Sequence, residues 1–82
     1  MLEKNIFLNT LEDVKSFVSL CMTKPYDIEL TSGKYIVNAK SIMGVFSLDL
    51  TKPLTMIINC DSDTAIENEL TPYLNKEILT NA

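Results

Sequence analysis

The chain has 82 residues, of which 46% are hydrophobic and 22% are charged, and its formal net charge is −4. This length suits one domain with one small core, and the composition is typical of a globular chain rather than a disordered one. Histidine and arginine are both absent, which removes the commonest general base, the commonest metal ligand and the planar guanidinium. An acidic chain without arginine also lacks the basic face of a nucleic-acid binder. We therefore expect a single domain over residues 1–82 that binds no nucleic acid.

The two cysteines do not form a CxxC pair; Cys21 lies between Leu20 and Met22, and Cys60 follows Ile58 by two residues. This setting is typical of free thiols in the core of a protein from a reducing compartment. No apolar run approaches the roughly 20 residues of a membrane span. The segment Met1–Asn5 has no uninterrupted apolar stretch of the kind found in a signal peptide. The sequence predicts a cytoplasmic protein without a membrane segment.

The first third of the chain predicts a strand and a helix. A short apolar run within Lys4–Leu8 favours a strand, and Asn9 or Thr10 can cap the helix that follows, since either side-chain oxygen can accept a free amide. Lys24-Pro25 ends that helix, because the residue before a proline is disfavoured in the helical region. Helical spacing assigns one core face to Leu11, Val14, Phe17, Val18 and Cys21.

The middle of the chain predicts a hairpin and a short helix. Polar and apolar residues alternate over Tyr26–Thr31, which indicates a half-buried strand, and residues 31–34 supply a turn in which Gly33 adopts positive φ. Tyr35–Val37 forms the returning strand. A short helix over Ile42–Leu48 is then capped by Ser41.

The last part predicts a fourth strand over Leu54–Cys60 and a final helix that Asp61, Ser62 or Asp63 can cap. Pro72 lies inside the pattern of that helix and should kink or split it. The inner face of the helix is predicted to carry Ile66, Leu70, Leu74 and Ile78. The order β-α-β-β-α-β-α predicts an α+β fold, in which three helices cover one face of a four-stranded antiparallel sheet.

The chain carries none of the common catalytic or nucleotide-binding motifs. Asp61-x-Asp63 could bind a divalent cation, but no third oxygen ligand accompanies the pair, and helix capping is the simpler role. Lys40 and Ser41 are adjacent, an arrangement that seldom brings a base to a nucleophile. We expect no enzyme activity, no cofactor and no metal site.

The segment Asn38–Leu48 holds the main candidate site. It places the Ser41 hydroxyl at a helix N-terminus, directly after Lys40 and before Ile42, Met43 and Phe46. A serine in this position can accept a phosphate, because the helix dipole and free amides stabilise the added charge. The apolar side chains exceed what one inner face needs, so the surplus would form a patch for a protein partner. The alternative is a helix cap with ordinary core residues.

This segment, with the pattern Asn-x-Lys-Ser-Ile-Met-Gly-x-x-Ser-Leu, resembles HPr, the small phosphocarrier of the bacterial sugar phosphotransferase system. The resemblance implies an HPr-like open-faced β-sandwich. It also implies that Ser41 is a regulatory site phosphorylated by an HPr kinase, and that the phosphorylated form binds a transcriptional regulator. The family's docking patch corresponds to Ile42, Met43 and Phe46, with Lys40 beside it.

The departure from the family is equally informative. In a gapless alignment from Ser41, the family's phosphorylated histidine falls on Thr10, its arginine on Glu12 and its proline on Asp13. Threonine cannot form the labile nitrogen–phosphorus bond, and the carboxylates would repel a phosphate. An offshoot of the family, the catabolite-repression homologue, also lacks the histidine and keeps the serine.

These residues together predict a small regulatory or binding protein related to the sugar phosphotransferase system that does not act as a histidine phosphocarrier. Two alternatives remain at this stage. One is a phosphocarrier component of that system. The other is an HPr-fold interaction or assembly subunit, such as a homodimer formed through the apolar patch or through an edge strand.

Overall fold

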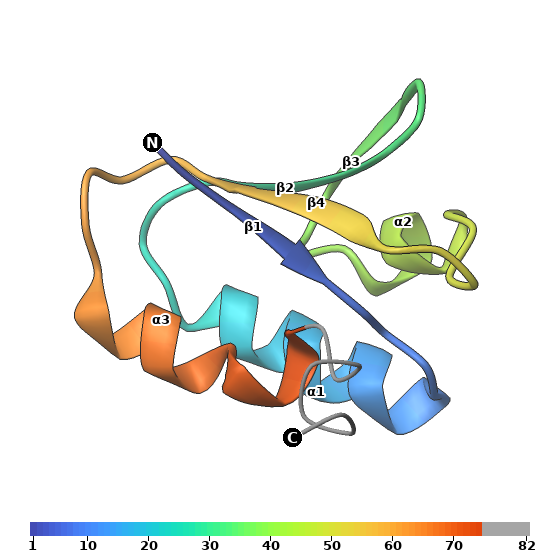
Figure 1. Ribbon diagram of the computed structural model, residues 1–82, viewed down its shortest axis with the longest axis horizontal. Helices are drawn as coiled ribbons and strands as arrows, with labels where there is room; N and C mark the ends of the chain where they lie inside the picture. The colour runs from blue at the N-terminus through green and yellow to red at the C-terminus, as the bar shows by residue number, and fades with distance from the viewer. Residues whose placement is uncertain (75–82) are drawn as a thin grey trace, which may run out of the picture.

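A computed structural model describes residues 1–74 of the chain (Figure 1). The elements follow in the order β1 (Leu2–Ile6), α1 (Leu11–Met22), β2 (Ile28–Ser32), β3 (Tyr35–Asn38), α2 (Ile42–Phe46), β4 (Leu54–Ile58) and α3 (Thr64–Glu69), with a final 3₁₀ turn, η1 (Thr71–Tyr73). The predicted order of strands and helices is confirmed.

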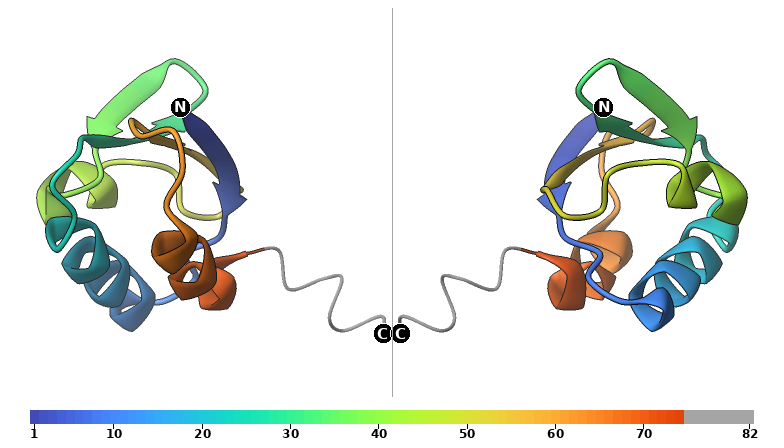
Figure 2. Two further views of the ribbon diagram at one scale, coloured as in Figure 1. Left: turned by 90° about the vertical axis from the view of Figure 1, so that its left-hand side faces the viewer. Right: turned by 90° about the vertical axis from the view of Figure 1, so that its right-hand side faces the viewer.

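The strands form one antiparallel sheet with the spatial order β1-β4-β2-β3. Figure 2 shows the helices gathered on one side of this sheet, with its other face uncovered. The fold is therefore the predicted α+β architecture with an open-faced sheet. None of the helices within residues 1–74 combines the length and the apolar character that a bilayer span requires.

Alternation along the strands explains why only one face is covered. Leu54, Met56 and Ile58 of β4 are buried, and the intervening Thr55 and Ile57 point to the open face. The helices bury their apolar faces against the covered side, where the rings of Phe17 and Tyr73 meet edge to face with centroids 5.6 Å apart. One core joins all the elements.

The predicted inner face of α1 is correct except at its first residue. Val14, Phe17, Val18 and Cys21 are buried, but Leu11 is 53% exposed. Leu11 opens the first turn of α1, and more than half of its surface is open to solvent. Its apolar character therefore contributes to the surface rather than to the core.

Strand ends depend on pairing partners as well as on apolar runs. The first strand covers Leu2–Ile6 rather than Lys4–Leu8, because its ladder with β4 runs from Leu2 opposite Ile58 to Ile6 opposite Leu54. Leu8 is still buried, in the loop beyond the ladder. The fourth strand ends at Ile58 rather than at Cys60, which is only partly buried.

Proline splits the last helical region, as predicted. α3 ends at Glu69, and Pro72 lies in the first turn of η1, where its missing N–H leaves no hydrogen bond unmade. Ile66 and Leu70 are buried, and Leu74 is partly buried and bridges to Ile6 of β1. Ile78, the last residue of the predicted inner face, lies outside the described residues.

A capping box begins α1 and should contribute measurable stability. The Thr10 hydroxyl accepts the Asp13 N–H at 3.0 Å, while the Asp13 carboxylate accepts the Thr10 N–H at 3.3 Å. Thr10→Ala should therefore cost about 1 kcal/mol of unfolding free energy and lower Tm by roughly 5 °C in thermal denaturation. Ser19→Ala, an exposed change within the same helix, should cost nothing. Equal losses in the two variants would contradict the role of the cap.

Candidate functional site

Several hydrogen bonds hold the loop before Ser41 at the end of β3. The Asn38 carbonyl accepts the Ser41 N–H at 3.0 Å, and the Asn38 side-chain oxygen accepts the Lys40 N–H at 2.8 Å. Between them Ala39 is fully buried, and its N–H donates to the Ile28 carbonyl of β2. These contacts set the position of Ser41 relative to the sheet.

Ser41 caps α2 and lies on the surface. Its backbone is extended, its hydroxyl oxygen accepts the Gly44 N–H at 3.2 Å, and the residue is exposed. Gly44 permits this close arrangement, because a Cβ there would lie 3.3 Å from the Ser41 Oγ and 3.4 Å from the Val37 Cβ. The predicted helix therefore begins as expected, although it ends at Phe46 rather than at Leu48, with Ser47 as its C-terminal cap.

Three apolar side chains of α2 remain on the surface. Ile42, Met43 and Phe46 are 37%, 78% and 41% exposed, whereas Val45 of the same helix is fully buried. Residues three and four apart share one side of a helix, so the three side chains are neighbours. We call these three residues the α2 patch. α2 packs beside α1 and against β3, and these contacts set the position of the α2 patch on the domain.

Lys40 is directed toward its own chain. It is only partly exposed, and its ammonium donates to the Lys24 carbonyl, just beyond the end of α1, at 2.8 Å. The Lys24 ammonium in turn pairs with Glu69 of α3 at 2.8 Å. Lys40 therefore links the loop before Ser41 to α1, and through Lys24 to α3.

A tyrosine–aspartate contact extends this network. The Tyr26 hydroxyl donates to Asp63 Oδ2 at 2.5 Å, and the other carboxylate oxygen of Asp63 accepts the Ile66 N–H at 3.1 Å as the cap of α3. The hydrogen bond from Tyr26 lowers the pKa of Asp63 below its ordinary value. Desolvation, followed by the contact with Asp63, raises the pKa of Tyr26. Asp63 is thus a helix cap, and residues 1–74 contain no cluster of metal-ligating side chains.

The start of α1 presents Glu12 and Asp13 where the resembled family has an arginine and a proline. Thr10 caps the helix, and the Asp13 carboxylate also accepts the Asn9 N–H at 3.0 Å. Glu12 is exposed beside it. The Asp13 carboxylate therefore places a negative charge of the chain itself at the positive end of the helix dipole.

The thiols form no disulfide. Cys21 is buried, and desolvation raises its pKa to about 12. Cys60 is partly buried rather than a full member of the core. Such a high pKa leaves Cys21 in the unreactive thiol form at neutral pH.

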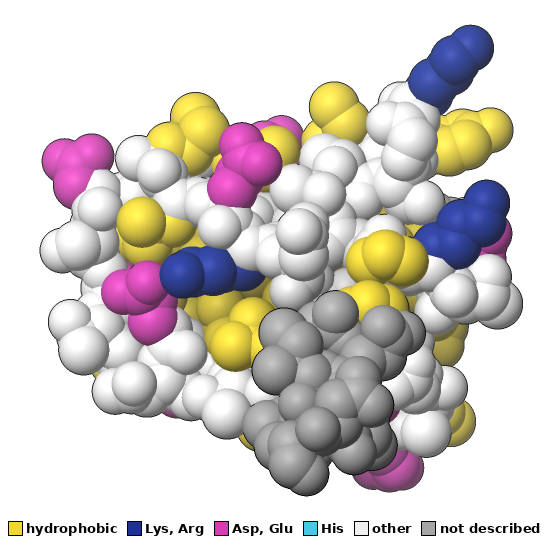
Figure 3. Space-filling view, in the orientation of Figure 1, with side chains coloured by type: hydrophobic (Ala, Val, Ile, Leu, Met, Phe, Trp, Pro, Cys, Tyr) yellow, Lys and Arg dark blue, Asp and Glu magenta, His cyan; other side chains and the backbone are white. Residues whose placement is uncertain are grey.

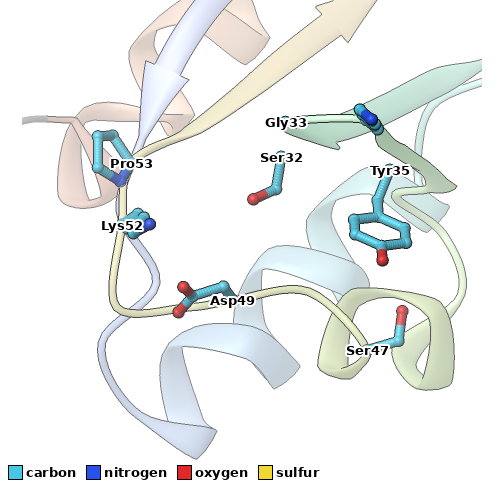
Figure 4. Close-up of a pocket in the computed structure, with 8 residues that line it drawn as sticks. Ser32, Gly33, Tyr35, Ser47, Asp49, Lys52 and Pro53 are labelled. Carbon is cyan, nitrogen blue, oxygen red and sulfur yellow. The ribbon is translucent and has the colours of Figure 1, made fainter.

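A pocket of about 690 Å³ lies between the β2–β3 hairpin and the segment after α2. Figure 4 shows Ser32 and Tyr35 of the hairpin across from Ser47 and Asp49, with Lys52 and Pro53 at one side. Sequence reasoning did not find this pocket, because its walls come from two segments that share no motif. Its Asp49 carboxylate accepts from both the backbone and the hydroxyl of Thr51, and these bonds lower its pKa.

The fold has a counterpart among solved structures. The crystal structure of HPr-C-His from Thermoanaerobacter tengcongensis aligns with a TM-score of 0.72 and 23% sequence identity, covering 88% of this chain and 89% of that chain. No protein-family model and no curated protein matches the chain. The structural likeness extends over nearly the whole domain, so the chain has the HPr-like open-faced β-sandwich fold that its sequence pattern predicts.

The Tyr26–Asp63 contact generates a prediction about pH. Because the pKa of Asp63 is lower in the folded chain than in the unfolded chain, its contribution to stability is present above about pH 4 and is lost as pH falls further. Tyr26→Phe should reduce that acid-dependent loss, because it removes the main cause of the lowered pKa. The measurement is urea denaturation from pH 7 to pH 3. Tyr35→Phe, at a tyrosine that is 73% exposed, should leave the profile unchanged; identical profiles for both variants would refute the coupling.

Proposed function

We propose that this chain is a small, non-enzymatic regulatory binding protein of the phosphotransferase type, in which phosphorylation of Ser41 controls docking through the α2 patch. The observation that carries the proposal is the juxtaposition at α2, where an exposed serine hydroxyl begins a helix whose Ile42, Met43 and Phe46 side chains are open to a partner. The HPr-like fold and the sequence pattern around Ser41 support the same reading. The partners are an HPr kinase and a transcriptional regulator in the cytoplasm.

The phosphate would be added in a setting that tolerates it. Ser41 is at the surface, so a kinase can reach its hydroxyl without unfolding the core. The added charge would lie at the N-terminal end of α2, which favours anions. Lys40 would support the site indirectly, because its contact with the Lys24 carbonyl holds the loop in place. An ammonium has three donors, so Lys40 could also contact a partner without breaking that contact.

The phosphocarrier alternative is disfavoured by the start of α1. Thr10 has no nitrogen that could carry a phosphoryl group. The Asp13 carboxylate lies in the first turn of α1, where it accepts the Asn9 and Thr10 amides and would repel a phosphate. Exposed Glu12 would add repulsion in place of the attraction that an arginine supplies. These residues support a regulatory role over transfer of phosphate to sugar.

The first test is phosphorylation at Ser41. Incubation with an HPr kinase, ATP and magnesium should add one phosphate to the intact mass of the wild-type chain and none to Ser41→Ala. Ser47→Ala is the matched control, since Ser47 is an exposed serine at the other end of α2, and it should still gain the phosphate. No gain in the wild type, or a gain that persists in Ser41→Ala, would show that Ser41 is a cap alone.

The second test addresses docking. Phe46→Glu removes an exposed aromatic ring from the α2 patch and adds a charge, so kcat/KM for the kinase should fall roughly tenfold or more. Met22→Glu is the control, because Met22 is 65% exposed at the end of α1 and lies outside the patch. Circular dichroism should show that both variants are folded. Equal kinase kinetics for the two variants would remove the patch from the docking surface.

A further inference from the structure

The two edges of the sheet are protected very differently. β1, at one edge, carries Glu3 and Lys4, and Lys4 pairs with Glu67 of α3 at 2.9 Å. Its far end is bridged by Leu74 opposite Ile6. β3, at the other edge, reads Tyr-Ile-Val-Asn and contains none of the charged, proline or bulged positions that usually prevent strands from pairing with another chain.

The hydrogen-bond register shows which groups β3 directs outward. The two-residue turn at Gly33 (φ 58°) and Lys34 makes Ser32 and Tyr35 a hydrogen-bonded pair. Such pairs alternate along an antiparallel ladder, and the Ala39 N–H to Ile28 carbonyl bond at 2.9 Å follows the same alternation. The N–H and C=O of Ile36, the Asn38 N–H and the Lys34 carbonyl therefore point away from β2, toward the open edge.

Apolar side chains accompany this edge on both faces. Tyr35 is 73% exposed on the helix side, as Figure 4 shows by its position over Ser47, and Ile36 is 63% exposed on the open side. Figure 3 shows a lysine and apolar side chains gathered over the hairpin. A partner that only packed on one face would leave one of these side chains uncovered, whereas an added strand would contact both.

We propose that β3 pairs with β3 of a second copy of this chain, antiparallel and centred on Ile36, to form a two-fold dimer with a continuous sheet. Each Ile36 would donate to and accept from the other, and each Asn38 N–H would donate to the Lys34 carbonyl of the other copy. The Ile36 side chains would meet on the open face. Each Tyr35 would lie beside the Val37 of the other copy on the helix side, an aromatic and β-branched pairing that stabilises sheets.

The register follows from the groups that are already engaged. A pairing centred on Val37 would require the Asn38 carbonyl to accept a hydrogen bond from the second copy. That carbonyl already accepts the Ser41 N–H, so this register is less favourable. In the pairing centred on Ile36, Asn38 contributes only its backbone N–H as a donor. No like charges then lie opposite each other. Because β3 is short, the interface is small, and we expect association in the high micromolar to millimolar range. This inference does not depend on phosphorylation of Ser41.

Oligomeric state provides the first test. Sedimentation equilibrium should show wild-type chain shifting from monomer toward dimer between micromolar and millimolar concentration. Ile36→Lys, an exposed change that leaves the core intact, should remain monomeric, and Phe46→Glu should dimerise like the wild type. A wild-type chain that stays monomeric at millimolar concentration would overturn the proposal. Loss of the dimer in Phe46→Glu but not in Ile36→Lys would also overturn it, by assigning the contact to the α2 patch.

Disulfide trapping tests the register. In a Cys60→Ser background, Ile36→Cys should form a cross-linked dimer under copper–phenanthroline oxidation, because residues facing each other across the two-fold axis lie about 5.5 Å apart at Cα. Asn38→Cys is the matched control on the same edge, and it should cross-link far more slowly because residue 38 faces residue 34. Equal rates for the two variants would reject the Ile36-centred pairing. The two tests are independent of the kinase assay, so either proposal can fail alone.

Discussion

The position of β4 between β1 and β2 is the constraint on which the rest of the domain depends. β4 pairs on both sides, and its buried Leu54, Met56 and Ile58 form the centre of the apolar face that the helices cover. β1 and β4 are separated by most of the chain, so this pairing closes the domain. It brings the start of α1, all of α2 and the cap of α3 to the same side of one sheet (Figure 2).

Polar contacts then set the positions of the segments that the core leaves at the surface. Lys40 reaches the Lys24 carbonyl, Lys24 reaches Glu69, and Tyr26 reaches Asp63. Each contact joins segments that are distant in sequence, and each is partly shielded or made with a charged group. The loop before Ser41 is therefore fixed by the ends of α1 and α3 as well as by its own turn.

The proposed functions use separate parts of this framework. The α2 patch lies on the helix side, at the end of the loop that Lys40 holds, whereas the open edge of β3 belongs to the sheet. Val37 connects the two, because it packs near Gly44 of α2 and would lie beside Tyr35 of a second copy. A partner on α2 and a second copy on β3 would thus contact neighbouring but different surfaces.

Local chemistry accounts for most of what the sequence predicts correctly. Four signals act within a few residues, so they can be recognised without knowing which segment packs alongside. They are the period-2 alternation in β2, the helical spacing in α1, the glycine where positive φ is required, and the prolines Pro25 and Pro72. The caps Thr10, Ser41 and Asp63 belong to the same group, since each bonds an amide three residues away. The order of these elements led to the α+β fold, and the resemblance of the segment around Ser41 to HPr led to its HPr-like form.

What only the tertiary structure decided involves groups that are far apart in the chain. The burial of Leu8 and the exposure of Leu11 depend on where the sheet ends, and the first strand begins at Leu2 because its ladder follows β4. The orientation of Lys40 depends on a carbonyl sixteen residues away, and the directions of the Ile36 backbone groups depend on the register with β2. The sequence by itself determined the kinds and order of the elements, their caps and most of their apolar faces, because these are local. The tertiary structure decided which side chains and which sheet edge remain open to a partner. The exposure of a residue depends on which distant segments of the chain pack against it.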